Sequence, residues 1–104
     1  MFFLLKKYRA ELGGNRRNVI VIGENEKTRQ LIEIFNDKSD FGYFFKAQFD
    51  TKNNFSLQNC FGFVIENNID EIYFSAKELT NHQINKLIDF ADNNLRELKF
   101  IPDN

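Results

Sequence analysis

Few residues of this 104-residue chain combine the types and the spacing that binding or catalysis requires. The most suggestive segment is residues 23–28, which lies between a β-branched run and a helical pattern. Dinucleotide-binding domains carry a G-x-G-x-x-G fingerprint at this position, and its second glycine lets the backbone approach a pyrophosphate. Here Gly23 supplies the first glycine, whereas Asn25 and Thr28 occupy the other two positions. The loop therefore predicts a weak or degenerate nucleotide site.

The charges of this loop also disfavour a bound phosphate. A helix N-terminus attracts anions through its free N–H groups and its dipole. Glu24 and Glu26 place two carboxylates there, and each would repel a phosphate about 5 Å away by on the order of 1 kcal/mol. Lys27 and Arg29 offset this repulsion only if their side chains turn back over the loop.

Two further residues complete the candidate site, because ligands of parallel α/β sheets bind beyond the carboxyl ends of the strands. Asp50 follows the second expected strand, where an acid can bind ribose hydroxyls, although it is 27 residues past Gly23 rather than the usual ~20. The alternative interpretation of Asp50 is a solvated turn aspartate. Ser75 ends the third expected strand. The candidate cofactor-binding residues are Gly23, Asn25, Asp50 and Ser75.

The remaining polar residues do not form a catalytic or metal-binding arrangement. His82 is the only histidine, has no carboxylate or cysteine at a catalytic spacing, and is expected on a helix surface. Cys60 is the only cysteine, so a disulfide framework and a conventional structural zinc site are excluded and a reducing compartment fits. We expect Cys60 to fill apolar space. Glu66, Asp70 and Glu71 cluster at the amino ends of strands, away from the expected ligand side.

The elements that position these residues follow from hydrophobic periodicity. Within the expected strand at 18–22, residues 19–22 form an unbroken apolar run, typical of a strand buried on both faces. Thr80 and Gln83 form a capping box that predicts the start of the third helix, and Pro102 stops the last strand. The expected elements are strands at 18–22, 43–49, 71–75 and 96–101, and helices at 26–37, 57–66 and from 81 onward.

Strands that alternate with helices require right-handed crossovers and give a parallel sheet covered on both faces. The sequence therefore predicts an α/β fold, a small Rossmann-like three-layer sandwich with a four-stranded parallel sheet over residues 18–104. The expected strand order is 2-1-3-4, and 3-2-1-4 is the alternative. The apolar helix stripes are expected to bury Ile65 on the second helix and Ile88 on the third.

The charges nearly cancel, with 14 Lys and Arg against 15 Asp and Glu, but they are unevenly placed. Residues 1–17 carry a net charge of +4 and residues 18–104 a net charge of −5. An acidic body disfavours a nucleic-acid-binding surface. In the leader, residues 1–5 are apolar and basic residues follow, which is too short to cross a bilayer and is the reverse of a secretory signal.

Two interpretations of this leader remain open. Residues 1–17 are either an amphipathic helix that packs on the domain or the cytoplasmic basic flank of a membrane helix, which would place residues 1–9 near the membrane. The chain is also a candidate for homo-oligomer formation through an exposed sheet edge or through residues 2–5.

Several segments, in order, suggest a known family. They are NRRNVIVIG at residues 15–23, FGY at 41–43, FD at 49–50, NIDEIY at 68–73 and FIPD at 100–103. Together they resemble the cytosolic Rossmann-like, CoA-binding-like domain of bacterial polyprenyl glycosylphosphotransferases. These enzymes are also called undecaprenyl-phosphate glucose or galactose phosphotransferases, or UDP-sugar lipid-carrier transferases.

The resemblance implies a parent protein with transmembrane helices before this domain and a membrane-associated catalytic domain after it. That catalytic domain transfers a sugar 1-phosphate from a UDP-sugar to undecaprenyl phosphate, which starts capsule or exopolysaccharide synthesis. The family's catalytic motifs have no counterpart in these 104 residues. The implied role is therefore a regulatory or scaffolding domain on the cytoplasmic side of an inner-membrane protein, with the rest of that enzyme as partner.

Two alternatives stay open beside this role. The chain is otherwise a degenerate nucleotide-binding domain of a membrane-bound nucleotide-sugar dehydratase or epimerase, or a free-standing nucleotide- or CoA-binding protein. In each case a weakly bound nucleotide is the one cofactor that the residues suggest.

Overall fold

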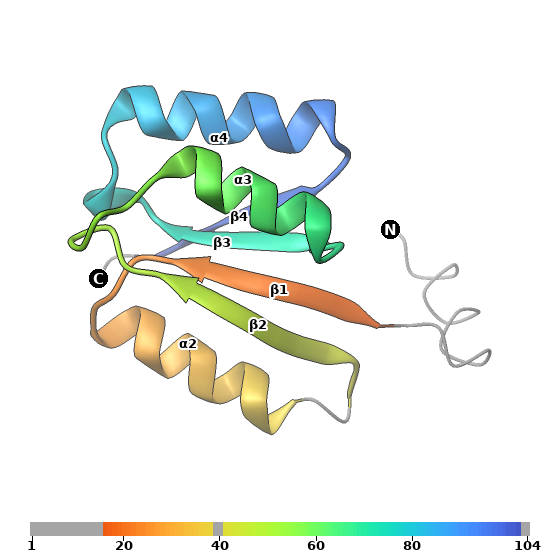
Figure 1. The fold of residues 1–104 in the computed structure, drawn as a ribbon. Helices are drawn as coiled ribbons and strands as arrows, with labels where there is room; N and C mark the ends of the chain where they lie inside the picture. The colour runs from red at the N-terminus through yellow and green to blue at the C-terminus, as the bar shows by residue number, and fades with distance from the viewer. Residues whose placement is uncertain (1–15, 39–40, 103–104) are drawn as a thin grey trace.

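Strands and helices alternate along the chain in the computed structural model (Figure 1). The structure describes residues 16–38 and 41–102, so most of the leader predicted at residues 1–17, including residues 1–9, lies outside the described residues. The strands are β1 (Arg17–Ile22), β2 (Tyr43–Phe49), β3 (Glu71–Ser75) and β4 (Glu97–Ile101). The helices are α2 (Glu26–Asp37), α3 (Leu57–Glu66) and α4 (Asn81–Asn93), with a short 3₁₀ helix, η2 (Ala76–Glu78).

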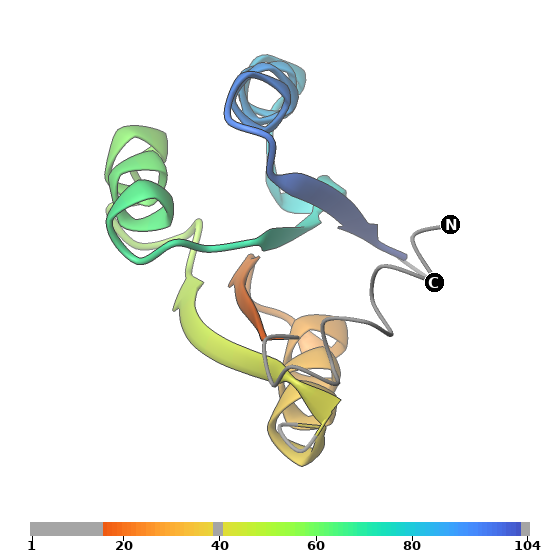
Figure 2. The same ribbon diagram turned by 90° about the vertical axis from the view of Figure 1, so that its right-hand side faces the viewer.

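The four strands form one parallel sheet in the order β2-β1-β3-β4. This confirms the predicted α/β three-layer class and selects the 2-1-3-4 order over 3-2-1-4. Helix α2 covers one face of the sheet, and α3 and α4 cover the other (Figure 2). The switch in strand order lies between β1 and β3, and the loops that follow these two strands therefore lie next to each other.

The central strand β1 supplies the core on both faces. Residues 19–22 are completely buried, as their unbroken apolar run predicts. Ile20 and Ile22 pack with Ile72 in the cluster beneath α3 and α4. Val19 and Val21 pack in the smaller cluster under α2. Burial on both faces fixes the register of β1, because a shift by one residue would exchange the two apolar sets.

The helix starts follow local sequence signals. The side chain of Asn25 accepts hydrogen bonds at the N-terminus of α2 and forms a capping box with Thr28. Thr80 and Gln83 form the predicted capping box of α4. Each box satisfies N–H groups that have no partner within the helix, which explains why these helices begin where the sequence predicts.

Two predicted core positions are wrong. Ile65 of α3 is 45 % exposed and Ile88 of α4 is 48 % exposed. Val64 and Leu87, which belong to the same two apolar stripes, are completely buried. Each of these helices buries only a narrow row of residues against the small sheet. A residue at the side of the apolar stripe, such as Ile65 or Ile88, is therefore not covered by the sheet. The spacing of apolar residues identified the stripe but did not determine its width.

We expect Leu87→Ala to lower the free energy of unfolding by about 2–5 kcal/mol, because it removes a completely buried side chain and leaves a cavity. The matched change Ile88→Ala, one residue along the same helix, should cost less than about 1 kcal/mol. Urea unfolding monitored by circular dichroism measures both values. Equal losses in the two variants would contradict the burial described for α4.

Candidate functional site

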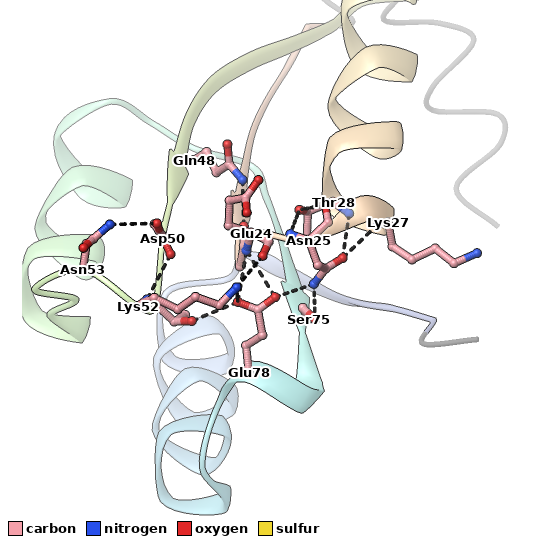
Figure 3. Close-up of polar contacts among 12 residues, drawn as sticks. Glu24, Asn25, Lys27, Thr28, Gln48, Asp50, Lys52, Asn53, Ser75 and Glu78 are labelled. Carbon is pink, nitrogen blue, oxygen red and sulfur yellow. Dashed lines mark hydrogen bonds and ion pairs between the residues drawn. The ribbon is translucent and has the colours of Figure 1, made fainter.

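Three loops meet at the carboxyl ends of the strands, which is where the sequence predicts a ligand crevice. They follow β1 at residues 23–25, β2 at residues 50–53 and β3 at residues 75–78 (Figure 3). Three of the candidate residues, Gly23, Asn25 and Ser75, lie together where these loops meet, and the word crevice refers below to this meeting point. The centre of the crevice is occupied by a side chain that the sequence analysis did not select.

That side chain belongs to Glu78, the last residue of η2, and it is 8 % exposed. Its carboxylate accepts hydrogen bonds from the backbone N–H of Glu24, at 3.0 and 3.2 Å to its two oxygens. It also accepts from the Thr51 hydroxyl at 2.9 Å and from the side-chain amide of Asn25. Lys52 Nζ lies 4.0 Å from Oε1. One carboxylate therefore links all three loops.

These contacts determine the charge state of Glu78. Burial by itself would raise the pKa of the Glu78 carboxyl. The hydrogen bonds from Glu24, Asn25 and Thr51, together with the charge of Lys52, outweigh burial and hold the pKa below its usual range. Glu78 is therefore an anion at neutral pH, held beside the start of α2.

Gly23 permits this close approach. Its φ of +123° lies in a region that other residues rarely adopt, and a Cβ there would lie 2.9 Å from Ser75 Cβ and 3.4 Å from Glu78 Cδ. Its N–H donates to the Phe49 carbonyl at 2.8 Å. In this chain Gly23 leaves space for the loop that follows β3. In the dinucleotide fingerprint the first glycine instead permits the tight turn toward the pyrophosphate.

Asn25 has used its polar atoms within the protein. Its Oδ1 accepts from the N–H groups of Lys27 at 2.9 Å and Thr28 at 3.1 Å. Its Nδ2 donates to Ser75 Oγ at 3.2 Å and to Glu78. The first-turn N–H groups that an open helix terminus would offer to a phosphate are thus partly satisfied by Asn25 itself.

Asp50 is not directed into the crevice. Its carboxylate accepts from the Lys52 N–H at 2.9 Å and from the Asn53 amide at 3.1 Å, and so closes its own turn. These contacts match the turn-aspartate interpretation. The ribose-binding role would require Asp50 to give up both hydrogen bonds.

Two of the three basic side chains around the crevice, those of Arg29 and Lys52, also have partners within the protein. Arg29 turns back toward the loop and pairs with the Glu24 carboxylate at 2.5 Å. Lys52 Nζ donates to the Glu24 carbonyl at 2.8 Å. Lys27 extends away from the crevice (Figure 3). Arg29 therefore partly offsets the charge of Glu24, while the buried carboxylate of Glu78 stays beside the start of α2.

Sequence reasoning missed Glu78, Thr51 and Lys52. The only candidate residue selected at the end of the third strand is Ser75, three residues before Glu78. The missing signal is η2, whose three residues the periodicity did not predict and which turns Glu78 back toward β1. The predicted adjacency of the first and third strands, combined with an acid shortly after the third, would have pointed to this contact.

A second polar cluster lies near the amino ends of the strands. Glu71 is 1 % exposed, and its carboxylate pairs with Arg17 Nη1 at 2.6 Å and accepts from the Tyr73 hydroxyl at 2.7 Å. Burial, together with Glu71, raises the pKa of Tyr73. Asp70 Oδ2 accepts from the Asn18 N–H at 2.8 Å. Asp70 and Glu71 join β1 to β3 at the end of the sheet opposite the crevice, as the sequence predicts, whereas Glu66, the third acid of the predicted cluster, is exposed at the C-terminal end of α3.

The other candidate reactive side chains have structural surroundings. Cys60 is completely buried, and burial raises the pKa of its thiol to about 12, which leaves it protonated and unreactive at neutral pH. His82 is exposed in the first turn of α4. Within residues 16–38 and 41–102, no cluster of three His, Cys, Asp or Glu side chains is arranged to hold a metal ion.

Comparison with known proteins does not identify the chain. No protein-family model, no curated protein and no solved structure matches it. In the part of the chain that the structure describes, no helix has both the length and the apolar character needed to cross a bilayer. The crevice geometry and the sequence motifs are therefore the basis for a functional proposal.

We expect Glu78→Gln to lower the free energy of unfolding at pH 7 by about 1–3 kcal/mol, because it removes a charged acceptor from several hydrogen bonds. The folded-state pKa of Glu78 is depressed, so its stabilisation is complete above the unfolded-state value of about 4.3 and is lost as the pH falls through the folded-state value. The difference between the two proteins should therefore shrink below about pH 4.

Urea unfolding from pH 7 to pH 3 measures this difference. Glu66→Gln, at the exposed C-terminal end of α3, is the matched control and should change little at any pH. A difference between wild type and Glu78→Gln that stays constant down to pH 3 would rule out the ionised carboxylate as the cause.

Proposed function

We propose that this chain is a non-catalytic scaffolding or regulatory domain of an enzyme that transfers a sugar 1-phosphate from a UDP-sugar to undecaprenyl phosphate. Support comes from the ordered motifs that resemble such domains and from the occupied crevice. In this proposal the domain lies on the cytoplasmic side of an inner-membrane protein, residues 1–9 lie near the membrane, and the catalytic domain is a separate part of the parent.

The observation that carries the non-catalytic role is the Glu78 carboxylate at the start of α2. A phosphate that entered here would have to displace Glu78 from the Glu24 N–H, the Thr51 hydroxyl and the Asn25 amide. If Glu78 stayed in place, two negative charges about 5 Å apart would repel each other by on the order of 1 kcal/mol or more. Either route lowers the affinity of the crevice for nucleotides.

The Glu78 carboxylate also stabilises the three loops by joining them to one another. An active nucleotide site keeps its donors free for the ligand, whereas this crevice satisfies them internally. A domain whose ligand site is closed by its own side chain retains a rigid surface, which is what a scaffold contributes to a larger enzyme. The alternatives that remain are a degenerate nucleotide-binding domain of a nucleotide-sugar dehydratase or epimerase and a free-standing nucleotide- or CoA-binding protein.

Titration calorimetry with UDP-glucose, UDP-galactose, NAD⁺ and coenzyme A separates these roles. The proposal expects no saturable heat up to about 1 mM ligand, which corresponds to a binding free energy weaker than about −4 kcal/mol. Glu78→Ala serves as the paired variant, because it removes the internal anion while leaving Gly23 and Asn25 in place. A dissociation constant below about 100 µM for the wild-type chain would contradict the scaffold role and favour a nucleotide-binding protein.

The position of the chain within its gene is a second test. The proposal expects codons for hydrophobic membrane spans upstream of this segment and for a membrane-associated transferase domain downstream. Sequencing the reading frame on both sides provides the answer. A frame that encodes neither feature would overturn the transferase assignment, and a dehydratase domain downstream would favour the alternative.

A further inference from the structure

The outer edge of β4 offers backbone groups for pairing. Among the described residues, β4 is the last strand of the sheet and pairs only with β3 (Figure 2). The Glu97 N–H donates to the Asp70 carbonyl at 3.0 Å, so Glu97 faces β3. Because successive residues of a strand alternate in direction, the backbone N–H and C=O groups of Leu98 and Phe100 point to the outside. Such an edge is a template for another strand.

The side chains along this edge are mixed in character. Phe100 is 60 % exposed although its ring contacts Phe74, and Leu95, just before the strand, is 93 % exposed. Glu97 and Lys99 lie on the opposite face from Leu98 and Phe100 and pair with each other at 3.7 Å. An edge with exposed apolar residues and one charge of each sign can pair with a strand of matching pattern.

We propose that two copies of this chain associate through β4 as an antiparallel pair with a two-fold axis at Leu98, which joins the two sheets into one. In this arrangement the Leu98 N–H of each copy donates to the Leu98 carbonyl of the other. The Phe100 N–H of each copy donates to the Arg96 carbonyl of the other. The Arg96 N–H already donates to the Ala91 carbonyl at 2.8 Å within its own chain and is not needed.

Charge selects this register. When a two-fold axis perpendicular to the sheet relates two antiparallel strands, each residue lies opposite a residue whose side chain is on the same face of the sheet. With the axis at Leu98, Glu97 of one copy lies opposite Lys99 of the other, and the pair occurs twice. An axis at Lys99 or at Glu97 would set identical charges against each other, which destabilises a strand pair.

The remaining side chains support the same register. An axis at Phe100 would place Pro102 in the ladder opposite Leu98, and proline has no N–H to donate. With the axis at Leu98, the exposed ring of Phe100 lies opposite Arg96 of the second copy. A guanidinium group beside an aromatic ring is a favourable contact.

A lone lysine on a strand edge normally opposes pairing with other strands. Here the lysine is Lys99, and Glu97 lies two residues before it. The two residues form a self-complementary pattern, because Glu97 of one copy faces Lys99 of the other. An isologous interface needs this property, since the same surface patch must match itself. The inference does not depend on the transferase assignment, because it uses the edge of the sheet and not the crevice.

The test is the solution mass of the full chain, measured by light scattering and sedimentation equilibrium. We expect the wild type to reach twice its chain mass of 12.4 kDa as concentration rises. Glu97→Lys and Lys99→Glu each set like charges opposite each other and should weaken the dimer roughly tenfold or more. The double variant Glu97→Lys with Lys99→Glu restores opposite pairs and should restore the dimer.

Glu66→Lys on α3 is the matched charge-reversal control and should leave the dimer unchanged, while circular dichroism confirms that each variant is folded. A wild type that stays monomeric to about 1 mM, where the free energy of association would be weaker than about −4 kcal/mol, overturns the proposal. So does a double variant that dimerises no better than the single variants.

Cysteine cross-linking tests the register independently. Leu98 would face Leu98 of the second copy at about 5.5 Å between Cα atoms, within the range of a disulfide. Leu98→Cys should therefore form a cross-linked dimer on mild oxidation. Phe100→Cys is the matched control, because it keeps Glu97 and Lys99 and its two copies lie on opposite sides of the axis, too far apart for a disulfide. Faster cross-linking by Phe100→Cys than by Leu98→Cys would overturn the proposed register.

Discussion

The hydrogen bond from the Glu24 N–H to the Glu78 carboxylate joins residues 54 positions apart and organises the ligand end of the domain. It requires β1 and β3 to be neighbours, a loop after β3 that turns back, and a glycine at position 23 that leaves room for it. It also requires Asn25 to cap α2 and direct its amide toward the same carboxylate. Each of these features has a local cause, and all of them are needed for the hydrogen bond between Glu24 and Glu78.

This contact also explains why the crevice differs from a nucleotide site on the same kind of sheet. The physical attraction is the same in both, since a helix N-terminus favours an anion whether the anion is a phosphate or a side chain. In this chain the anion is covalently part of the fold, so the loops are ordered without a ligand. Exposed apolar side chains lie elsewhere on the domain, among them Phe100 on the edge strand β4.

Local signals explain why most elements could be predicted. The bounds of α2, α3, β2 and β3 agree with the sequence analysis because caps and hydrophobic periods act over a few residues. The rules for parallel crossovers left two strand orders open, and the structure selected β2-β1-β3-β4. Ile65 and Ile88 were assigned wrongly because periodicity gives the direction of an apolar stripe, while the layer above it determines how wide the buried strip is.

The sequence by itself determined the element order, the parallel α/β class and the absence of the second and third fingerprint glycines, because each can be read from neighbouring residues. Only the tertiary structure decided that Glu78 occupies the crevice, that Asp50 closes its own turn and that Arg29 reaches back to Glu24. The physical reason is distance along the chain. A charge is drawn to a helix terminus only when the fold brings the two together, and η2, a three-residue turn without periodicity, sets that approach.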